Sequence, residues 1–212
     1  MTKQKQILVY DFDGVICKSV DIKTDAFLEL YKDCDESIKS RIVKYHHKHG
    51  GISRFKKIQY IEGDLLGNKI DERYLEKMGK KFSKIVKTKV INADYVEGVL
   101  NFIQLNSKKY RQFICTGTPH EEIMEIVTKK NILKLFEGIY GSPQKKANIL
   151  NEIISKNEVN SDDIIFFGDA ITDYDAAKES CVRFIGIKNE KTNFPESTKL
   201  INNFLNFKIT DL

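Results

Sequence analysis

The sequence has little of several features that would assign it to a special class of protein. It contains no tryptophan, three prolines and four cysteines. The cysteines form no Cys-x-x-Cys pair, which argues against a zinc knuckle or a dithiol redox motif. No stretch approaches the roughly 20 consecutive apolar residues of a membrane span, and the segment before Ile7 is too short for a signal peptide. We therefore expect a cytoplasmic protein with reduced thiols and no membrane partner.

The sequence also lacks the motifs of nucleotide and nucleic-acid binding. It has no P-loop and no Gly-x-Gly-x-x-Gly fingerprint. Its net charge of +5 is unevenly spread, because residues 18–92 hold 18 Lys and Arg against 11 Asp and Glu. Such an excess can attract nucleic acid, but no recognition motif or aromatic-basic interleaving accompanies it. We interpret the lysines as solvated helix faces and expect no nucleic-acid partner.

The apolar residues that are present follow two different periodicities. With 212 residues, 41% hydrophobic and 31% charged, the chain is typical of a globular protein with one domain and an insertion, or with two small domains. Residues 22–90 show helical spacing and no convincing strand. From about residue 95, strands at 111–116, 138–141, 163–168 and 183–187 alternate with helices at 96–106, 119–130, 144–156 and 173–180.

This alternation predicts an α/β fold with a Rossmann-like parallel sheet that is covered by helices on both faces. The apolar run Ile7–Tyr10 belongs to the same sheet as its first strand. We therefore predict a core domain from residues 1–17 and 93–212, interrupted by an all-helical domain at 18–92.

Acidic residues follow two of the predicted strands. Asp11 and Asp13 come directly after the first strand, and Asp169 and Asp173 follow the strand at 163–168. Because ligands of open α/β sheets bind at the carboxyl ends of the strands, we expect these side chains to meet in one pocket. Around a single lysine they would carry a charge of about −3, and carboxylates about 4 Å apart repel by roughly 4 kcal/mol per pair. A hard divalent cation relieves this repulsion, and Mg²⁺ suits oxygen ligands and a substrate phosphate better than zinc.

Four motifs resemble, in order, those of the haloacid dehalogenase-like superfamily of phosphotransferases. They are DFDGVI, ICTGT, a lysine within GSPQKKANIL, and GDAITD. The resemblance covers most of the chain, and the helical insertion after the first motif is similar to the C1-type cap of the phosphoglycolate phosphatase and β-phosphoglucomutase branch.

The resemblance implies catalytic roles for five residues. Asp11 would be the nucleophile that forms an aspartyl-phosphate, and Asp13 would protonate the leaving oxygen and then activate water. Thr116 and the N–H of Gly117 would hold the phosphoryl group. The motif lysine would be Lys146, because its spacing matches the family's Lys-x-x-Ile-Leu, with neighbouring Lys145 as the alternative.

The resemblance also implies a magnesium site. Asp11, Asp169 and the carbonyl of Asp13 would bind Mg²⁺, and Asp173 would orient a metal-bound water or the lysine. The dehalogenases of the superfamily lack an acid at the position of Asp13, because halide leaves without a proton. Its presence here implies phosphate esters as substrates.

The helical domain offers a further candidate in the segment HHKHGGISRFKK. Its Gly-Ile-Ser-Arg stretch resembles the specificity loop of the β-phosphoglucomutase-like branch, which implies that Arg54 binds substrate. Lys23 stands where that branch has a catalytic histidine, and we interpret it as a solvated helix lysine, with an approach to the substrate as the alternative. The cluster of His46, His47 and His49 has no ligand partner with metal-binding spacing, so we interpret these residues as cations at a helix C-terminus.

These observations predict a Mg²⁺-dependent phosphatase that acts on a small phosphorylated metabolite such as a sugar phosphate or phosphoglycolate. The absence of the mutase histidine favours hydrolysis, with a mutase of the β-phosphoglucomutase type as the alternative. A receiver domain of two-component signalling, a second alternative, places its phosphoacceptor on the third strand rather than the first. The sequence identifies neither the metabolite nor the oligomeric state.

Overall fold

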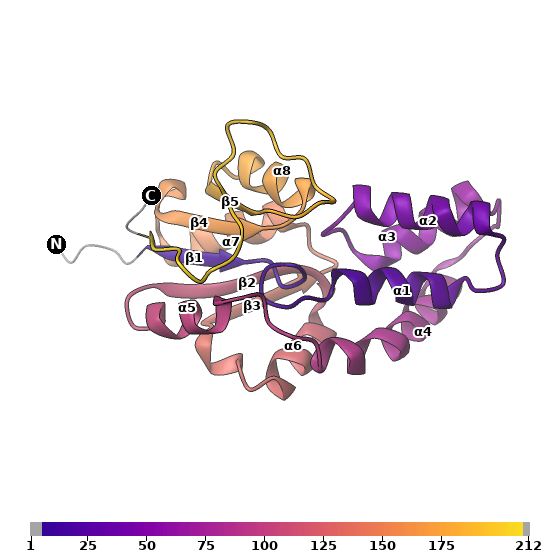
Figure 1. The fold of residues 1–212 in the computed structure, drawn as a ribbon, viewed down its shortest axis with the longest axis horizontal. Helices are drawn as coiled ribbons and strands as arrows, with labels where there is room; N and C mark the ends of the chain where they lie inside the picture. The colour runs from indigo at the N-terminus through magenta and orange to yellow at the C-terminus, as the bar shows by residue number, and fades with distance from the viewer. Residues whose placement is uncertain (1–5, 210–212) are drawn as a thin grey trace.

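The computed structural model describes residues 6–209 and contains a six-stranded sheet in the order β3-β2-β1-β4-β5-β6 (Figure 1). Every strand pairing is parallel. The strands are β1 (Ile7–Tyr10), β2 (Arg111–Pro119), β3 (Gly138–Ser142), β4 (Ile164–Gly168), β5 (Arg183–Ile187) and β6 (Leu200–Ile201). The predicted Rossmann-like α/β fold is confirmed.

Helices cover both faces of the sheet. They are α5 (Val99–Asn106), α6 (His120–Lys129), α7 (Lys146–Asn157) and α8 (Ile171–Glu179), with short turns η2 (Leu133–Leu135) and η3 (Ser161–Asp163). Leu8 and Tyr10 of β1 share an apolar cluster with α5 and α6, whereas Ile7 and Val9 share a second cluster with α7 and α8. Successive side chains of a strand point to opposite faces, so an apolar strand without alternation is buried on both sides.

The insertion between β1 and β2 is helical throughout, as predicted. It comprises α1 (Val20–Leu30), α2 (Glu36–Lys48), α3 (Arg54–Tyr60), the π-helical turn η1 (Ile61–Leu65) and α4 (Glu72–Ile91). The side chains of Asp35 and Asp71 cap α2 and α4 by accepting hydrogen bonds from backbone N–H groups three residues ahead. We call this helical block the cap. Its apolar interior is continuous with the cluster beneath α5 and α6, which attaches the cap to the core.

Several boundaries differ from the sequence prediction by two or three residues, and β2, predicted to end at residue 116, continues to Pro119. Helix α5 begins at Val99, three residues later than expected, and α8 begins at Ile171, two residues earlier. Strand β6 was not predicted, because two residues are too few to show a periodicity.

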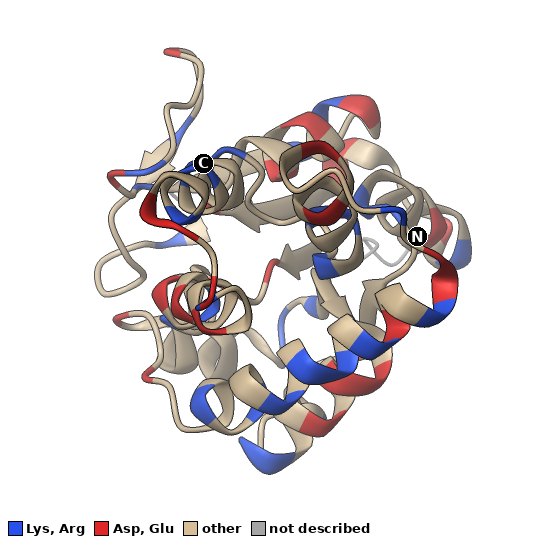
Figure 2. Cartoon of the chain, turned by 90° about the vertical axis from the view of Figure 1, so that its right-hand side faces the viewer, with Lys and Arg blue, Asp and Glu red and all other residues tan. Residues whose placement is uncertain are grey.

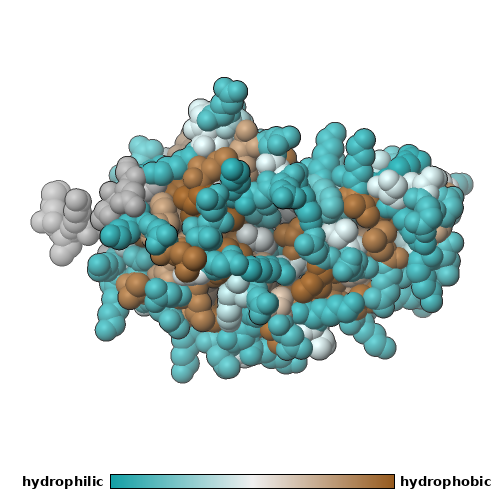
Figure 3. Space-filling view, in the orientation of Figure 1, coloured by the Kyte–Doolittle hydropathy of each residue, from teal (hydrophilic) through white to brown (hydrophobic). Residues whose placement is uncertain are grey.

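The surface is polar, and its charges are mixed. Figure 2 shows Lys and Arg interspersed with Asp and Glu along the helices of the cap end. The face in Figure 3 is mostly hydrophilic, with apolar side chains visible only in small separate areas. Among the described residues, no helix has the length and apolar character needed to cross a bilayer.

Phe167 provides a test of the core. Its side chain is fully buried and stacks on Tyr10 with ring centroids 5.1 Å apart. We predict that Phe167→Ala lowers the free energy of unfolding by about 3–5 kcal/mol, because it leaves a cavity beneath the sheet. Urea denaturation followed by circular dichroism measures this change. Leu105→Ala, at a side chain that is 66% exposed, is the control and should stay within about 0.5 kcal/mol; equal effects would contradict the packing.

Candidate active site

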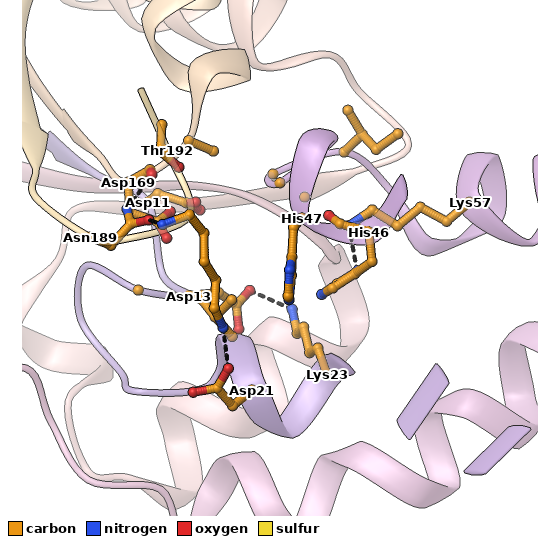
Figure 4. A pocket seen from close by; sticks show the side chains of 18 of the residues that line it. Asp11, Asp13, Asp21, Lys23, His46, His47, Lys57, Asp169, Asn189 and Thr192 are labelled. Carbon is orange, nitrogen blue, oxygen red and sulfur yellow. Dashed lines mark hydrogen bonds and ion pairs between the residues drawn. The ribbon is translucent and has the colours of Figure 1, made fainter. Parts of the chain in front are cut away.

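A cavity of about 300 Å³ lies between the cap and the carboxyl ends of the central strands. Asp11, Asp13 and Asp169 line it from the core, and α1, α3 and the Gly50–Gly51 loop line it from the cap. Figure 4 shows acidic side chains on one side of this cavity and basic side chains of the cap on the other. The predicted pocket at the carboxyl edge of the sheet is therefore present.

Three of the predicted acidic residues form one cluster. Strands β1 and β4 are neighbours at the point where the strand order reverses, which brings Asp11 and Asp169 together. Asp173 joins them from the first turn of α8, where its Oδ2 also accepts a hydrogen bond from the N–H of Ala170 at 3.2 Å. Carboxylate oxygens of Asp11, Asp169 and Asp173 all lie within 4.8 Å of one another.

Lys146 is the basic residue of this cluster. It is the first residue of α7 and is almost fully buried; its Nζ lies 2.9 Å from Oδ2 of Asp11 and also pairs with Asp173. Burial opposes the charged form, but the two carboxylates outweigh it and raise the pKa of Lys146. Lys145, the alternative left open by the sequence, is the N-cap residue and is exposed.

One lysine does not neutralise three carboxylates. Burial, the largest cause, raises the pKa of Asp11 to about 7 despite the opposing charge of Lys146. Burial and the neighbouring Asp11 also raise the pKa of Asp169 well above its usual range. The donor set consists of carboxylate oxygens alone, which fits a hard divalent cation such as Mg²⁺.

Asp13 lies next to this cluster but binds different partners. Its carboxylate pairs with Lys23 and accepts hydrogen bonds from Ser19 Oγ at 2.6 Å and Thr118 Oγ1 at 3.2 Å. Burial would raise the pKa of Asp13, but Lys23 and the hydroxyl donors outweigh it and lower that pKa. The side chain is therefore engaged away from the acidic cluster, and a metal contact of Asp13 stays predicted only through its carbonyl.

The interpretation of Lys23 as a solvated helix lysine is wrong. Its side chain is 15% exposed, and besides pairing with Asp13 it donates to Thr118 Oγ1 at 2.8 Å. Helix α1 begins at Val20, so its first turn directs Lys23 back toward the strand end. The sequence signal available for it was its position in the first turn after the Asp-Phe-Asp-Gly motif.

Thr116 and Gly117 lie at the end of β2, as predicted. Thr116 is fully buried and its Oγ1 accepts a hydrogen bond from the N–H of Thr118 at 3.2 Å, whereas Gly117 lines the cavity. A Cβ at position 117 would lie 2.2 Å from the carbonyl oxygen of Gly51. Only glycine therefore permits this approach between core and cap.

The Gly50–Gly51 loop lies directly over the carboxyl edge of the sheet. Thr172 Oγ1 donates a hydrogen bond to the carbonyl of Gly50. Gly51 has φ +76°, and a Cβ there would lie 2.7 Å from Thr172 Oγ1 and 3.0 Å from Lys146 Nζ. The structure therefore has the cap in a closed position over the site.

Arg54 lies in the cavity wall, where its positive charge is already paired with the carboxylate of Glu122. Its Nη1 donates to Ser83 Oγ at 2.6 Å and to Glu122 Oε2 at 2.9 Å, and its Nη2 pairs with Glu122 Oε1. Arg54 is 5% exposed and Glu122 is 8% exposed. Since Glu122 belongs to α6, this buried ion pair joins cap to core.

The interpretation of the three histidines as helix C-terminal cations is also wrong. Burial is the largest cause that lowers the pKa of each, and that of His46 falls to about 2. His46 is 7% exposed, and its Nδ1 lies 2.8 Å from Nζ of Lys57. The ring is therefore neutral and accepts a hydrogen bond from the lysine.

The sequence prediction did not include Ser19 and Glu122 in the site, and it included Thr118 only as part of the ICTGT motif, without a role. Thr118 follows the Thr-Gly pair at the end of β2, so its position was a usable signal. Ser19 and Glu122 carried none, because only the tertiary fold brings them to Asp13 and Arg54.

The acidic cluster predicts a measurable affinity for Mg²⁺. We expect Mg²⁺ to raise the melting temperature of the wild type and Asp169→Asn to lose most of that rise, because a neutral amide relieves the repulsion that the cation relieves. Affinity should fall from pH 8 to pH 6, since Asp11, with a pKa of about 7, takes up a proton that competes with the metal. Thermal scans and titration calorimetry measure both effects.

The matched control is Asp175→Asn, at an exposed aspartate of α8, the helix that follows Asp169. It should keep the full response to Mg²⁺. An equal loss in both variants, or no response in the wild type, would contradict a metal site at this cluster.

Comparisons with known proteins agree with this geometry. The chain shares its fold with a "predicted phosphoglycolate phosphatase" of Haemophilus somnus 129pt (16% identity, TM-score 0.75, 96% of each chain covered). It is also similar to β-phosphoglucomutase of Clostridium difficile (17% identity, TM-score 0.76, 98% of this chain and 95% of that one covered). A third similar structure, a Bacillus subtilis protein described as a HAD-hydrolase, is bound to magnesium (14% identity, TM-score 0.68, 95% and 96% covered).

At these identities the likeness concerns the fold alone. A search of curated proteins finds no significant match. The family model for haloacid dehalogenase-like hydrolases, however, matches residues 8–187, which include all four motifs. The chain therefore belongs to the haloacid dehalogenase-like hydrolase family.

Proposed function

We propose that the protein is a Mg²⁺-dependent phosphatase that hydrolyses a small phosphorylated metabolite through an aspartyl-phosphate on Asp11. The observation that carries this proposal is the arrangement of Asp11 at the cavity. Its carboxylate lies 2.9 Å from Lys146 and within the acidic cluster, and Asp13 lies beside it with a separate set of partners. A nucleophile and an acid-base residue thus have different electrostatic environments two residues apart.

In the first step, a carboxylate oxygen of Asp11 attacks phosphorus, and the bond to the ester oxygen breaks. Asp13 protonates that oxygen as it leaves. The low pKa of Asp13 keeps it ionised in the free enzyme. Asp13 therefore first accepts a proton from the bound substrate and then passes it to the leaving oxygen, because phosphate monoesters have their second pKa at about 6 and are partly monoanionic at neutral pH.

In the second step, ionised Asp13 removes a proton from water, which attacks the aspartyl-phosphate and restores Asp11. Lys146 and the N–H of Gly117 neutralise charge on the phosphoryl oxygens, and Thr116 supports the end of β2 that presents this N–H. Lys23 holds Asp13 in position from the cap side. Most of the catalysis is then positioning and charge neutralisation, as phosphoryl transfer requires.

Asp11, Asp169 and Asp173 would hold the Mg²⁺, together with the carbonyl of Asp13. When bound, the ion supplies positive charge that draws the phosphoryl group to Asp11 and offsets the repulsion among the carboxylates. The Bacillus subtilis relative with bound magnesium supports this assignment.

The alternative is a phosphomutase. A mutase must keep water from its aspartyl-phosphate, whereas a phosphatase must admit it. The pairing of Asp13 with Lys23 favours hydrolysis, because it stabilises the ionised carboxylate that activates water. Release of inorganic phosphate, compared with formation of an isomeric sugar phosphate, separates the two activities.

The cavity sets the size of the substrate. A volume of about 300 Å³ is at the lower limit of typical ligand pockets and suits a sugar phosphate or a phosphoglycolate-like molecule. Arg54 would contribute to substrate binding as part of the closed cavity wall, where Glu122 balances its charge. No nucleic acid or membrane is needed as a partner.

A panel of phosphorylated metabolites tests the proposal. Purified protein should release phosphate from at least one small phosphomonoester with Mg²⁺ present and lose this activity with a chelator. Asp11→Asn should reduce turnover at least about 1,000-fold, because an amide is a poor nucleophile. Asp175→Asn is the control and should keep its activity. Phosphate release that persists in Asp11→Asn would contradict the mechanism.

The closed loop leads to a second prediction. Gly51→Ala should lower kcat/KM on the order of 100-fold, because the new methyl group would collide with Thr172 and Lys146 and displace the cap loop from the site. Gly67→Ala is the matched control, since Gly67 has a similar φ of +70° but no neighbour within 4 Å of a Cβ. An equal loss of kcat/KM in both variants would show that backbone strain, and not loss of cap closure, lowers the activity. No loss in Gly51→Ala would show that this contact is not needed.

A further inference from the structure

Lys57 is a buried cation of the cap that the proposed mechanism does not use. It lies on α3, is 4% exposed and lines the cavity. Its Nζ donates to Nδ1 of His46 at 2.8 Å and lies 3.3 Å from the carbonyl oxygen of His46. Both acceptors are neutral, and an ammonium group has three N–H donors, so these contacts leave the charge uncompensated.

The other buried or half-buried cations of the cavity have acidic partners. Lys23 pairs with Asp13, and Arg54 pairs with Glu122. Within residues 6–209, no ion pair joins Lys57 to a carboxylate. Among the described residues that line the cavity, Lys57 is therefore a buried cation without a carboxylate partner, whereas Lys188, which also lacks an ion pair, is exposed to solvent.

An unpaired buried ammonium group is costly, because burial removes its hydration without an opposite charge in return. Burial, followed by the positive charge of Lys23, lowers the pKa of Lys57 to about 7, and the carboxylates of Asp13 and Asp169, which form no ion pair with it, offset only part of this effect. The ring of Phe27, 6.0 Å from Nζ, offers only a weak compensating interaction. Such a group lowers the stability of the free protein, and buried groups of this kind concentrate at functional sites.

Lys57 faces the acidic cluster across the cavity. Figure 4 shows Lys57 and His46 on the side of the cap, separated from Asp11 and Asp169 on the opposite side. A phosphoryl group placed at Asp11 would leave the remainder of the substrate extending toward this wall. Whatever part of the substrate reaches Lys57 is therefore not the reacting phosphate.

We propose that Lys57 and its His46 support form a subsite for a second anionic group of the substrate, either a carboxylate or a second phosphate. This inference rests on the proposed function and restricts the range of substrates that we expect the enzyme to accept. The preferred substrates are phosphomonoesters with an anion at the far end of a small carbon skeleton. The substrate's own charge then replaces the carboxylate that the protein does not provide.

Matched pairs of probes test the subsite. Each pair has one ligand with the second anion and one of similar size without it: phosphoglycolate with ethyl phosphate, 3-phosphoglycerate with glycerol 3-phosphate, and glucose 1,6-bisphosphate with glucose 1-phosphate. In the wild type with Mg²⁺, kcat/KM should favour the member with the second anionic group in at least one pair by tenfold or more. The pair with the larger preference shows whether the subsite binds a carboxylate or a second phosphate.

The decisive variant is Lys57→Met, which keeps the length of the side chain and removes its charge. The preference within the favoured pair should fall at least tenfold, and the melting temperature of the free protein should rise by about 2 °C or more because an unpaired buried charge is gone. Lys56→Met, at the exposed neighbouring lysine, should change neither the preference nor the melting temperature. An unchanged preference in Lys57→Met, or no tenfold preference in the wild type, would overturn the subsite.

A binding measurement separates this outcome from a failure of the proposed reaction. Titration calorimetry of the same pairs with Asp11→Asn, alone and combined with Lys57→Met, needs no turnover. If the wild type releases no phosphate but binding still depends on Lys57 and the second anion, the reaction is wrong and the subsite stands. If phosphate is released but binding shows no such dependence, the subsite is wrong and the phosphatase stands.

Discussion

The repulsion among buried carboxylates at the ends of β1 and β4 is the constraint on which the rest of the site depends. Asp11, Asp169 and Asp173 are brought within 4.8 Å of one another by the parallel sheet and by the first turn of α8. Lys146 offsets only part of their charge, as the raised pKa values of Asp11 and Asp169 indicate. The apolar sheet beneath holds this arrangement in place, because both faces of its central strands are fully buried.

Charge is distributed differently on the two walls of the cavity. The core wall has an excess of carboxylates, which calls for a cation. The cap wall has basic groups whose charge is balanced at Lys23 and Arg54 but not at Lys57. A phosphorylated ligand with its metal would bring a cation to the carboxylates of the core wall and an anion to Lys57 on the cap wall. The closed cap and the distribution of charge therefore favour the same kind of ligand.

Closure itself depends on a few contacts between cap and core. The Gly51 carbonyl approaches Gly117, Thr172 donates to Gly50, and Arg54 pairs with Glu122. Each contact joins the core to the same cap segment, residues 50–54, and two of them involve core residues next to the acidic cluster or the cavity. The position of the cap is therefore coupled to the geometry of the candidate site.

The sequence by itself determined the fold class, the helical insertion and the chain positions of the acidic residues at the strand ends, because these are local properties. Apolar periodicity identifies strands and helices, and a strand end followed by Asp-Phe-Asp places two carboxylates at the edge of a sheet. Tertiary structure alone decided the electrostatic partners. Lys23 turns back to Asp13, His46 is neutral, and Arg54 pairs with Glu122, 68 residues away along the chain. Charge pairing and burial depend on which side chains meet in space, and no spacing along the chain contains that information.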